Sequence, residues 1–424
     1  MQRVEFIHRV NSFNIIGQNG GRERSMLEKL KSIAEKGHPE VVELRRHFHR
    51  NPEIAWKEVE TTEKVAEILK DLGFENIKQG FGGTSCGVTA DLCGTMPGPC
   101  VALRADMDAL PLQEENRIPY CSQNKGVMHA CGHDAHTAML LGAAKVISQM
   151  KDELAGKVRF IFQPAEEHGL KSGADHMVRE GVLEGVDVIF GIHVRSSMPT
   201  GKIALRSGPT MASCDAWEAM ITGRGGHGAE PDQAVDPTVP AGHIITSLQS
   251  IIGREINSKE TSVISLGKIE AGSAFNIIPE SVKLLGTCRT FRPEVQDMIE
   301  EKLGRLIKGI SESFRCTSEY VYTKYVPSVI NDPEAISLAK KLGNEIFGNE
   351  NVIETSLEMA SEDFSYFQQK VPGAFGFLGT AKEEKGSANP HHSPLFDVDE
   401  DALLQGVQIL AGFALSWKED SREG

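Results

Sequence analysis

The chain has 424 residues, a net charge of -14 at pH 7, and 40% apolar and 25% charged residues. This composition is typical of a globular protein with a sizeable core, and the length predicts two domains. The negative charge argues against nucleic acid or an anionic membrane surface as a partner. No run of about 18 apolar residues occurs, so no transmembrane helix is expected.

The cysteine pattern and the N-terminus suggest a compartment. Eight cysteines are scattered without the close spacing of a disulfide scaffold, which favours a reducing, cytoplasmic location. The first 25 residues contain four arginines and a glycine-rich stretch, and they lack the apolar core of a secretory signal. An organelle transit peptide remains an alternative, but we expect residues 1–25 to be a disordered extension.

From residue 26 onward, segments with helical apolar spacing alternate with short β-rich runs. Helices are predicted over 27–48, 58–72 and 137–150. Strands are predicted over 86–90, 100–105, 157–162 and 187–192. Polar residues follow the carboxyl ends of these strands, among them Asp106 and Asp108. This order predicts an α/β fold with a central, mostly parallel sheet whose ligands bind outside those strand ends.

A different order begins near residue 207. Strands are predicted over 215–222, 262–269, 282–289 and 319–326, and helices over 237–252 and 295–314. Strand–helix–strand–strand–helix–strand predicts a smaller α+β, ferredoxin-like domain inserted into the first. After residue 331 the chain returns to helices and a glycine-rich strand at 374–379. The predicted domains are therefore 26–207 with 322–418, and the insertion 208–321.

The stretch 129–136 concentrates groups that bind metals. Cys131 and His133 are one residue apart, so in an extended segment or a tight turn both can point at one ion. Asp134 and His136 could hold these ligands in place through hydrogen bonds. The alternative is a solvated polar loop, but three imidazoles beside a thiol and a carboxylate argue against it. We predict a metal site here.

Further candidates lie elsewhere in the chain. Glu166 and Glu167 follow a predicted strand directly, and adjacent acids on one turn point in different directions. One can then bind a metal while the other reaches a water molecule, as hydrolysis requires. His193 also ends a predicted strand, although a lone histidine is more often an ordinary hydrogen-bonding residue. His391 and His392 form a weaker candidate.

Several of these segments together resemble a known family. The segments are 129–136, 163–167, 191–193, 225–231 and 392–397. In this order they resemble the zinc-dependent aminoacylase/carboxypeptidase family of metallopeptidases. Within it, they are similar to the amidohydrolase branch that includes hippurate hydrolases, N-acyl-amino-acid deacylases and auxin-conjugate hydrolases. The resemblance extends from about residue 26 to about residue 417.

The resemblance implies a set of roles at the metal site. Cys131 would bridge or share two metal ions, in place of the bridging Asp of the wider family, and Glu166 would be the general base. The remaining ligands would be His133, Glu167, His193 and His392. One or two divalent ions per subunit are expected, zinc or manganese, with cobalt or nickel as alternatives. Asp108 falls in the position of a family His-x-Asp motif and is expected to orient a ligand; a loop-capping role is about as plausible.

The resemblance also assigns residues of the inserted domain. In the family a lid histidine reaches a neighbouring active site and stabilises the oxyanion, and His227 matches it. Asn276 and Arg289 resemble residues that bind a substrate carboxylate, a task that suits the guanidinium fork. The insertion is therefore expected to be a lid and dimerisation domain, and the protein a homodimer or homotetramer.

The implied activity is hydrolysis of N-acyl-L-amino acids, with acetyl, benzoyl or indole-acetyl groups, to a carboxylic acid and a free amino acid. Glu166 would remove a proton from the attacking water, and His227 would stabilise the tetrahedral oxyanion. A dipeptidase or carboxypeptidase using the same site is an alternative. A non-catalytic protein that binds acyl-amino acids is another, and loss of Glu166 or Cys131 would favour it; both are present.

Overall fold

The structure is a computed structural model that describes residues 2–418. The chain divides into two compact units. The first unit comprises Met1–Arg206, Asn331–Thr355 and Phe367–Gly424, and the inserted unit comprises Ser207–Ile330 and Ser356–Tyr366. The predicted boundary after residue 321 falls inside strand β13 (Thr317–Val326). That strand is paired with β8 (Cys214–Thr222) along its length and cannot be divided from it.

The first unit is built on an eight-stranded sheet in the order β1-β2-β4-β3-β5-β16-β6-β15. Its strands are β1 Glu75–Gln79, β2 Val88–Cys93, β3 Met96–Asp106, β4 Ala155–Gln163, β5 Val188–Pro199, β6 Ile203–Ala204, β15 Val352–Ile353 and β16 Gly373–Ala381. The four central strands, β4, β3, β5 and β16, are parallel to one another. The predicted α/β fold with a mostly parallel sheet is confirmed.

The helices of the first unit are α1 Gln2–Arg50, α2 Val59–Asp71, α3 His133–Gln149, α4 Gly173–Arg179, α7 Pro333–Phe347 and α9 Ala402–Ser416. The short α8, Ser365–Gln368, begins in the last residues of the inserted unit and ends in the first unit. A disordered extension was predicted for residues 1–25; the described structure has helix α1 beginning at Gln2 within this stretch. No proline precedes Pro39, so no residue blocks the helical backbone there. Within the described residues no helix combines the length and apolar character needed to cross a membrane.

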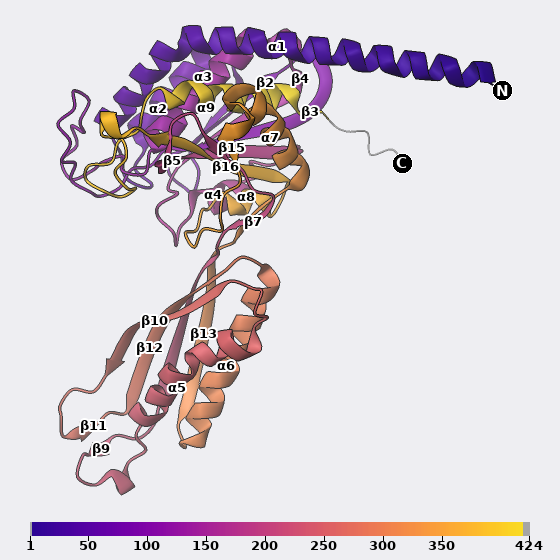
Figure 1. Cartoon of the computed structure of the whole chain (residues 1–424). Helices are drawn as coiled ribbons and strands as arrows, with labels where there is room; N and C mark the ends of the chain where they lie inside the picture. Colours follow the sequence, from indigo (N-terminus) through magenta and orange to yellow (C-terminus); the bar gives the residue numbers. More distant parts are fainter. Residues whose placement is uncertain (1, 419–424) are drawn as a thin grey trace. The chain divides into compact units, whose positions relative to one another are not determined.

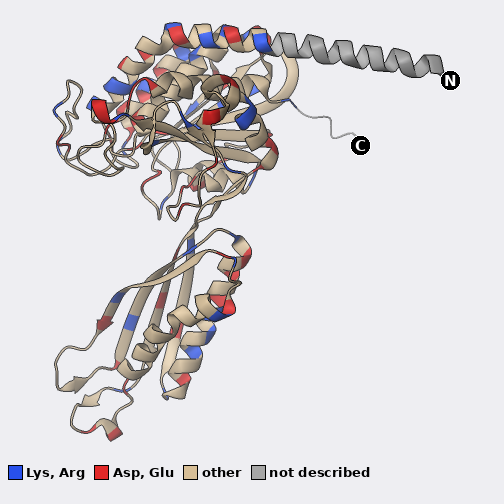
Figure 2. Ribbon diagram, in the orientation of Figure 1, with Lys and Arg blue, Asp and Glu red and all other residues tan. Residues whose placement is uncertain are grey.

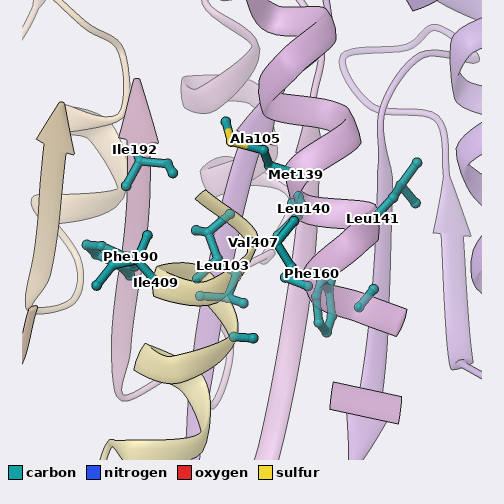
Figure 3. Close-up of a cluster of buried hydrophobic side chains, with 14 of the residues drawn as sticks. Leu103, Ala105, Met139, Leu140, Leu141, Phe160, Phe190, Ile192, Val407 and Ile409 are labelled. Atoms are coloured by element: carbon teal, nitrogen blue, oxygen red, sulfur yellow. The ribbon is translucent and has the colours of Figure 1, made fainter. Parts of the chain in front are cut away.

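The core of the first unit lies between the central strands and the helices α3 and α9 (Figure 1, Figure 3). Leu103, Phe160 and Phe190 project from three neighbouring strands toward these helices, and the Phe190 ring stacks on Phe413 of α9 at 4.4 Å. Each such large apolar side chain contributes about 1.5–3 kcal/mol when buried. Because α9 is apolar around nearly its whole circumference, it is buried, and α1 packs against it and against α3.

The inserted unit is a four-stranded antiparallel sheet in the order β10-β12-β8-β13. Its further elements are β10 Ser262–Ala271, β12 Ser281–Thr290, α5 Thr238–Ser250 and α6 Pro293–Ser313. This order is that of the predicted ferredoxin-like domain. Buried residues such as Trp217, Ile244 and Ile299 join the sheet to both helices. Figure 2 shows acidic and basic residues along α6, whose outer face is polar.

Candidate metal centre

The candidate ligands of the first unit lie where parallel strands of the sheet end. Asp106 is the last residue of β3 and pairs with Gln163, the last residue of β4. The β3–β5 register pairs Arg104 with Gly191, so His193 lies two residues further on, level with Asp106. His193 was predicted to end a strand, but it lies within β5. The strand is longer than its apolar run because it continues beside β16.

A left-handed turn at Gly132 separates Cys131 from His133. Gly132 has φ +91° and is the N-cap of α3, which begins at His133, earlier than the predicted start. A Cβ atom on Gly132 would lie 2.4 Å from Cγ2 of Val194, so only glycine fits. The turn brings Cys131 Sγ to 3.5 Å from Nε2 of His193. Of the two conformations expected for this stretch, the tight turn is the one observed.

Hydrogen bonds fix which nitrogen of each imidazole can bind a metal. His133 Nδ1 lies 2.9 Å from the backbone oxygen of Asp108 and 3.2 Å from its Oδ1, so Nδ1 carries the donated proton. His133 Nε2 is buried and has no hydrogen bond of ordinary geometry within residues 2–418. His193 Nδ1 donates to the oxygen of Val194 at 2.6 Å, which leaves Nε2 facing Cys131. Each ring can therefore bind a metal only through Nε2, once that nitrogen carries no proton.

His136 supports this arrangement without offering a free nitrogen. Its Nδ1 donates to Asp106 Oδ1 at 2.6 Å, and its Nε2 accepts the N–H of Val194 at 2.9 Å. Asp106 also accepts a hydrogen bond from Arg104 at 2.7 Å. Asp106, His133 and His136 are close enough to hold an ion, but both nitrogens of His136 are already engaged. Sequence reasoning noticed Asp106 as a loop acid but did not assign it this contact.

Two triads of potential ligand atoms share one sulfur. Cys131, His133 and His193 form the first, and Cys131, Glu167 and His392 form the second; within each, the atoms lie within 4.8 Å of one another. Glu167 Oε1 is 3.1 Å from His392 Nε2. The backbone N–H of His392, which has φ +62°, donates to the oxygen of Ala130 at 2.8 Å. The described structure therefore brings all five predicted ligands together.

The turn after β4 carries the two adjacent acids. Ala165 adopts φ +52°, which is unusual for a residue with a side chain. The N–H of Glu167 donates to Asp108 Oδ2 at 3.0 Å, so Asp108 contacts both this turn and the His133 ring. Carboxylate oxygens of Glu166 and Glu167 lie within 4.8 Å of each other and of a His133 nitrogen. The two acids are thus held beside the same group of ligand atoms.

In the absence of a cation, burial and neighbouring charges favour the protonated forms of Cys131 and His133. Burial, and then the Glu167 carboxylate, raise the pKa of the Cys131 thiol well above its ordinary value. Burial lowers the pKa of His193 well below its usual range, which keeps this ring neutral. For His133, burial lowers the pKa, but Asp106 and Cys131 outweigh it and raise the pKa well above 6.5. Since ligands bind metals deprotonated, a divalent cation would balance this donor set.

Asp134 points away from the ligands toward α1. Its Oδ2 accepts from Arg45 Nε at 2.8 Å and lies 2.7 Å from His49 Nδ1. Arg45 Nη2 also donates to Asp397 at 2.6 Å, and the Arg45 side chain is fully buried. Asp134 thus connects the helix that begins at His133 to α1. Sequence reasoning missed Arg45 and His49, although a charged residue within the apolar stripe of α1 was a usable signal.

Two predicted residues of the inserted unit lie together. His227 is in β9 (Gly226–His227), which pairs with β11 (Ile277–Ile278), and Asn276 precedes β11. The N–H of Gly228 donates to the oxygen of Asn276 at 2.9 Å. A hollow of about 730 Å³ has both His227 and Asn276 in its wall. Phe275, beside them, is fully exposed.

Arg289 lies at the other end of the inserted unit. It is near the end of β12, pairs with Val263 of β10, and donates to the oxygen of Ser213 at 3.4 Å. Ser281, at the start of β12, is next to the segment that carries His227. The eight steps along the strand from Ser281 to Arg289 span about 27 Å. Asn276 and Arg289 were assigned a common task, but one inserted unit does not bring them together.

Comparison with known proteins agrees with this geometry. Residues 102–416 match the family described as Peptidase family M20/M25/M40. The chain is 40% identical over 393 residues to thermostable carboxypeptidase 2 of Saccharolobus solfataricus, covering 92% of this chain and 99% of that protein. It is 38% identical over 380 residues to N-acetylcysteine deacetylase of Bacillus subtilis, covering 89% and 97%.

A solved structure also matches. The YXEP protein of Bacillus subtilis, described as a dinuclear metal binding peptidase from the M20 family, superposes with a TM-score of 0.80 at 36% identity, covering 90% of this chain and 98% of that chain. The family match, the fold and a divalent-metal site in this position are therefore consistent with one another. This chain belongs to the M20/M25/M40 peptidase family, and it is a metal-dependent hydrolase of that family.

Proposed function

We propose that this protein hydrolyses the amide bond of N-acyl-L-amino acids, releasing a carboxylic acid and the free amino acid. The observation that carries the proposal is the pair of ligand triads that share Cys131, with Glu166 beside them. A general base next to a metal site is the arrangement that hydrolysis of an unactivated amide requires. The deacetylase of Bacillus subtilis, named for an N-acetyl amino acid, supports this substrate class.

The donor set supports two divalent ions per subunit. Cys131, His133 and His193 would hold one ion, and Cys131, Glu167 and His392 the other. Sulfur, imidazole and carboxylate donors suit zinc, and manganese, cobalt or nickel can occupy such sites. Bound ions would polarise the amide carbonyl and lower the pKa of a water molecule.

The side chains of this protein would move the protons. Glu166 would take a proton from the attacking water and return it to the leaving nitrogen as the C–N bond breaks. Asp108 would keep His133, and the backbone oxygen of Val194 would keep His193, in the ligand-binding tautomer, since each accepts the Nδ1 proton. His136, held by Asp106, would position Val194 by accepting its N–H.

We further propose that the inserted unit is a lid and dimerisation domain of a homodimer or homotetramer. His227 would donate a hydrogen bond to the tetrahedral oxyanion in the site of a neighbouring subunit. Asn276, beside His227, and Arg289, at the opposite end of the unit, would then bind the substrate carboxylate from different subunits. This assignment is supported by the exposed Phe275 and by the distance that separates Asn276 from Arg289. The eight free thiols support a reducing, cytoplasmic location.

The test is metal analysis combined with a substrate panel. Purified protein is assayed on acetyl-, benzoyl- and indole-acetyl-amino acids, with and without a chelator and with metal added back. We expect hydrolysis that the chelator abolishes and metal restores, and a loss of about 10²–10⁴-fold in kcat for Glu166→Gln with metal content unchanged. Near-normal turnover by metal-loaded Glu166→Gln would contradict the assignment of the base.

A second candidate is carboxypeptidase activity, favoured by the match to a relative named for it. The two functions differ in the group on the acyl side of the scissile bond. Including dipeptides with free amino groups and their N-acetylated forms in the same panel separates them. Faster hydrolysis of the peptides with free amino groups would favour a carboxypeptidase or dipeptidase function over hydrolysis of N-acyl amino acids.

A further inference from the structure

A buried carboxyl group that the proposed mechanism does not use lies against the turn that carries Glu166. Glu58 precedes helix α2 and is fully buried. Its Oε1 accepts the backbone N–H of Ala165 at 2.8 Å. Ala165 has φ +52°, a conformation that is unfavourable for any residue with a Cβ atom. The contact therefore falls on the strained residue immediately before the proposed general base.

Helix capping does not account for Glu58. It occupies the N-cap position of α2, yet its side chain makes no capping hydrogen bond. The first N–H groups of α2 are bound instead by Glu53, whose carboxylate accepts from Glu60 at 3.2 Å and Thr61 at 2.8 Å. The Glu58 carboxyl is directed away from its own helix, toward a turn 107 residues further along the chain.

The backbone on both sides of Glu166 is held by buried carboxyl groups. Glu58 binds the N–H of Ala165, and Asp108 binds the N–H of Glu167. The Glu58 contact holds the Pro164–Ala165 peptide group, one residue before Glu166, and the Asp108 contact holds the Glu166–Glu167 peptide group. Together they limit the backbone conformations of the turn and so the directions in which the Glu166 side chain can point. Asp108 was expected to orient a ligand, whereas nothing in the sequence marked Glu58 as its counterpart.

Burial and the nearby Asp108 carboxylate raise the pKa of Glu58 to about 8. The group is therefore mainly protonated at neutral pH, which removes the repulsion that two buried carboxylates so close to the metal ligands would otherwise have. A neutral carboxyl still accepts a hydrogen bond through its carbonyl oxygen. The Cys86 thiol, which also contacts Glu58, stays neutral as well, because burial and Glu58 raise the pKa of Cys86 to about 12.

We propose that Glu58 is a positioning residue for the general base: its carboxyl holds the Ala165 turn in the conformation that directs Glu166 at the reacting water. This inference rests on the proposed role of Glu166. It predicts that the hydrogen-bond acceptor at position 58 is required, and that a negative charge there is not.

The experiment compares Glu58→Gln, which keeps the acceptor, with Glu58→Met, which has similar volume and no equivalent oxygen. Glu53→Met is the matched control. Like Glu58, Glu53 accepts hydrogen bonds from backbone N–H groups, but both of its donors belong to α2. For each protein we measure kcat, KM, metal content, thermal unfolding, and hydrogen exchange of the peptide that contains residues 163–169.

We expect Glu58→Met to lower kcat by about 10–100-fold, as loss of a residue that orients an active-site group does, with KM within about threefold and metal content unchanged. Exchange of the 163–169 peptide should become at least about tenfold faster. Glu58→Gln should retain the protection and most of the kcat. Glu53→Met should lower the unfolding temperature and leave kcat and this peptide unchanged.

Three results would overturn the proposal: wild-type kcat in Glu58→Met, equal losses in the Gln and Met variants, or a loss of kcat that follows a loss of metal. If the wild-type protein hydrolyses no N-acyl amino acid, the proposed function fails separately. Hydrogen exchange then still decides the role of Glu58, because unchanged exchange in Glu58→Met would show that the residue does not hold the turn.

Discussion

The buried Asp134 carboxylate has two cationic or potentially cationic partners within hydrogen-bonding distance in the described structure, Arg45 and the imidazole of His49. Replacing Arg45 by Met would leave only His49. The guanidinium of Arg45 is completely buried and binds Asp134 at 2.8 Å and Asp397 at 2.6 Å. Burial alone would raise the pKa of Asp134, but Arg45 and His49 hold this pKa far below its usual range. The carboxylate is therefore charged and depends on these partners.

Loss of one partner of a buried ion pair costs roughly 3–5 kcal/mol, because the remaining charge stays buried and uncompensated. At roughly 2–3 °C per kcal/mol for a unit of this size, the unfolding temperature of Arg45→Met should fall by about 6–15 °C. Metal affinity should fall as well, by about 10–100-fold, since Asp134 follows His133 directly and Asp397 is five residues beyond His392.

The assay is thermal unfolding of chelator-treated protein, followed by competition with a chromophoric chelator for metal affinity. Arg46→Met is the matched control: Arg46 is the next residue, its side chain is 35% exposed, and its ion pair with Glu400 is near the surface. Such pairs contribute about 0–1 kcal/mol, so the control should unfold within about 3 °C of the wild type. Equal unfolding temperatures for the two variants would refute the reasoning.

Three further predictions concern the turn, the shared ligand and the buried acid. Gly132→Ala should destabilise the protein by roughly 1–3 kcal/mol in urea unfolding, because it adds a Cβ clash to a strained φ. In the control Gly126→Ala, where φ is +76° and the surrounding space is open, the cost should be only about 1 kcal/mol. Equal costs in the two variants would show that the clash at Gly132 does not contribute. Cys131→Ala should lose bound metal and activity together. Cys316→Ala, which removes a buried thiol of the inserted unit, should keep both. If Cys131→Ala remained active and metal-loaded, Cys131 would not be a metal ligand. In the folded protein the pKa of Glu58 is about 8, above the ordinary value of 4.5 for a glutamate. The stability that comes from its protonated form is therefore complete below about pH 4.5 and is lost as the pH rises through about 8. Glu58→Gln, facing the same Asp108 and Cys86, should therefore gain stability relative to the wild type between pH 5.5 and pH 8.5 in urea unfolding, and a difference that does not change with pH would contradict the shift.

The sequence by itself was sufficient for the order of the elements, and it pointed to the group of potential ligands that the fold brings together. Short, continuous apolar runs such as 100–105 and 157–162 are typical of strands that are buried on both faces of a sheet. These runs lie in the central strands β3 and β4. The crowding of thiol, imidazole and carboxylate groups around Cys131 predicts a metal site, because such donors rarely collect in one short stretch for another reason. The alternating strand and helix order of the insertion likewise followed from local periodicity alone.

Local signals failed where an element's limits depend on partners elsewhere in the chain. Helix α3 begins at His133, four residues before the predicted start. The left-handed φ of Gly132, which packs closely on Val194, ends the preceding segment and places the first helical residue at His133. His193 stands inside β5, because pairing with β16 extends that strand past its apolar run. Neither the packing on Val194 nor the strand pairing is visible in the residues that are adjacent in sequence.

The positioning of the site was decided only by tertiary structure. The contacts of Arg45 with Asp134, of Glu58 with Ala165 and of His136 with Asp106 join residues that are 89, 107 and 30 positions apart. Residue types indicate which groups can bind a metal or move a proton. Which nitrogen of His133 is bound by Asp108, and how the turn that carries Glu166 is held, depends on buried hydrogen bonds that form only when the sheet and its helices are packed together.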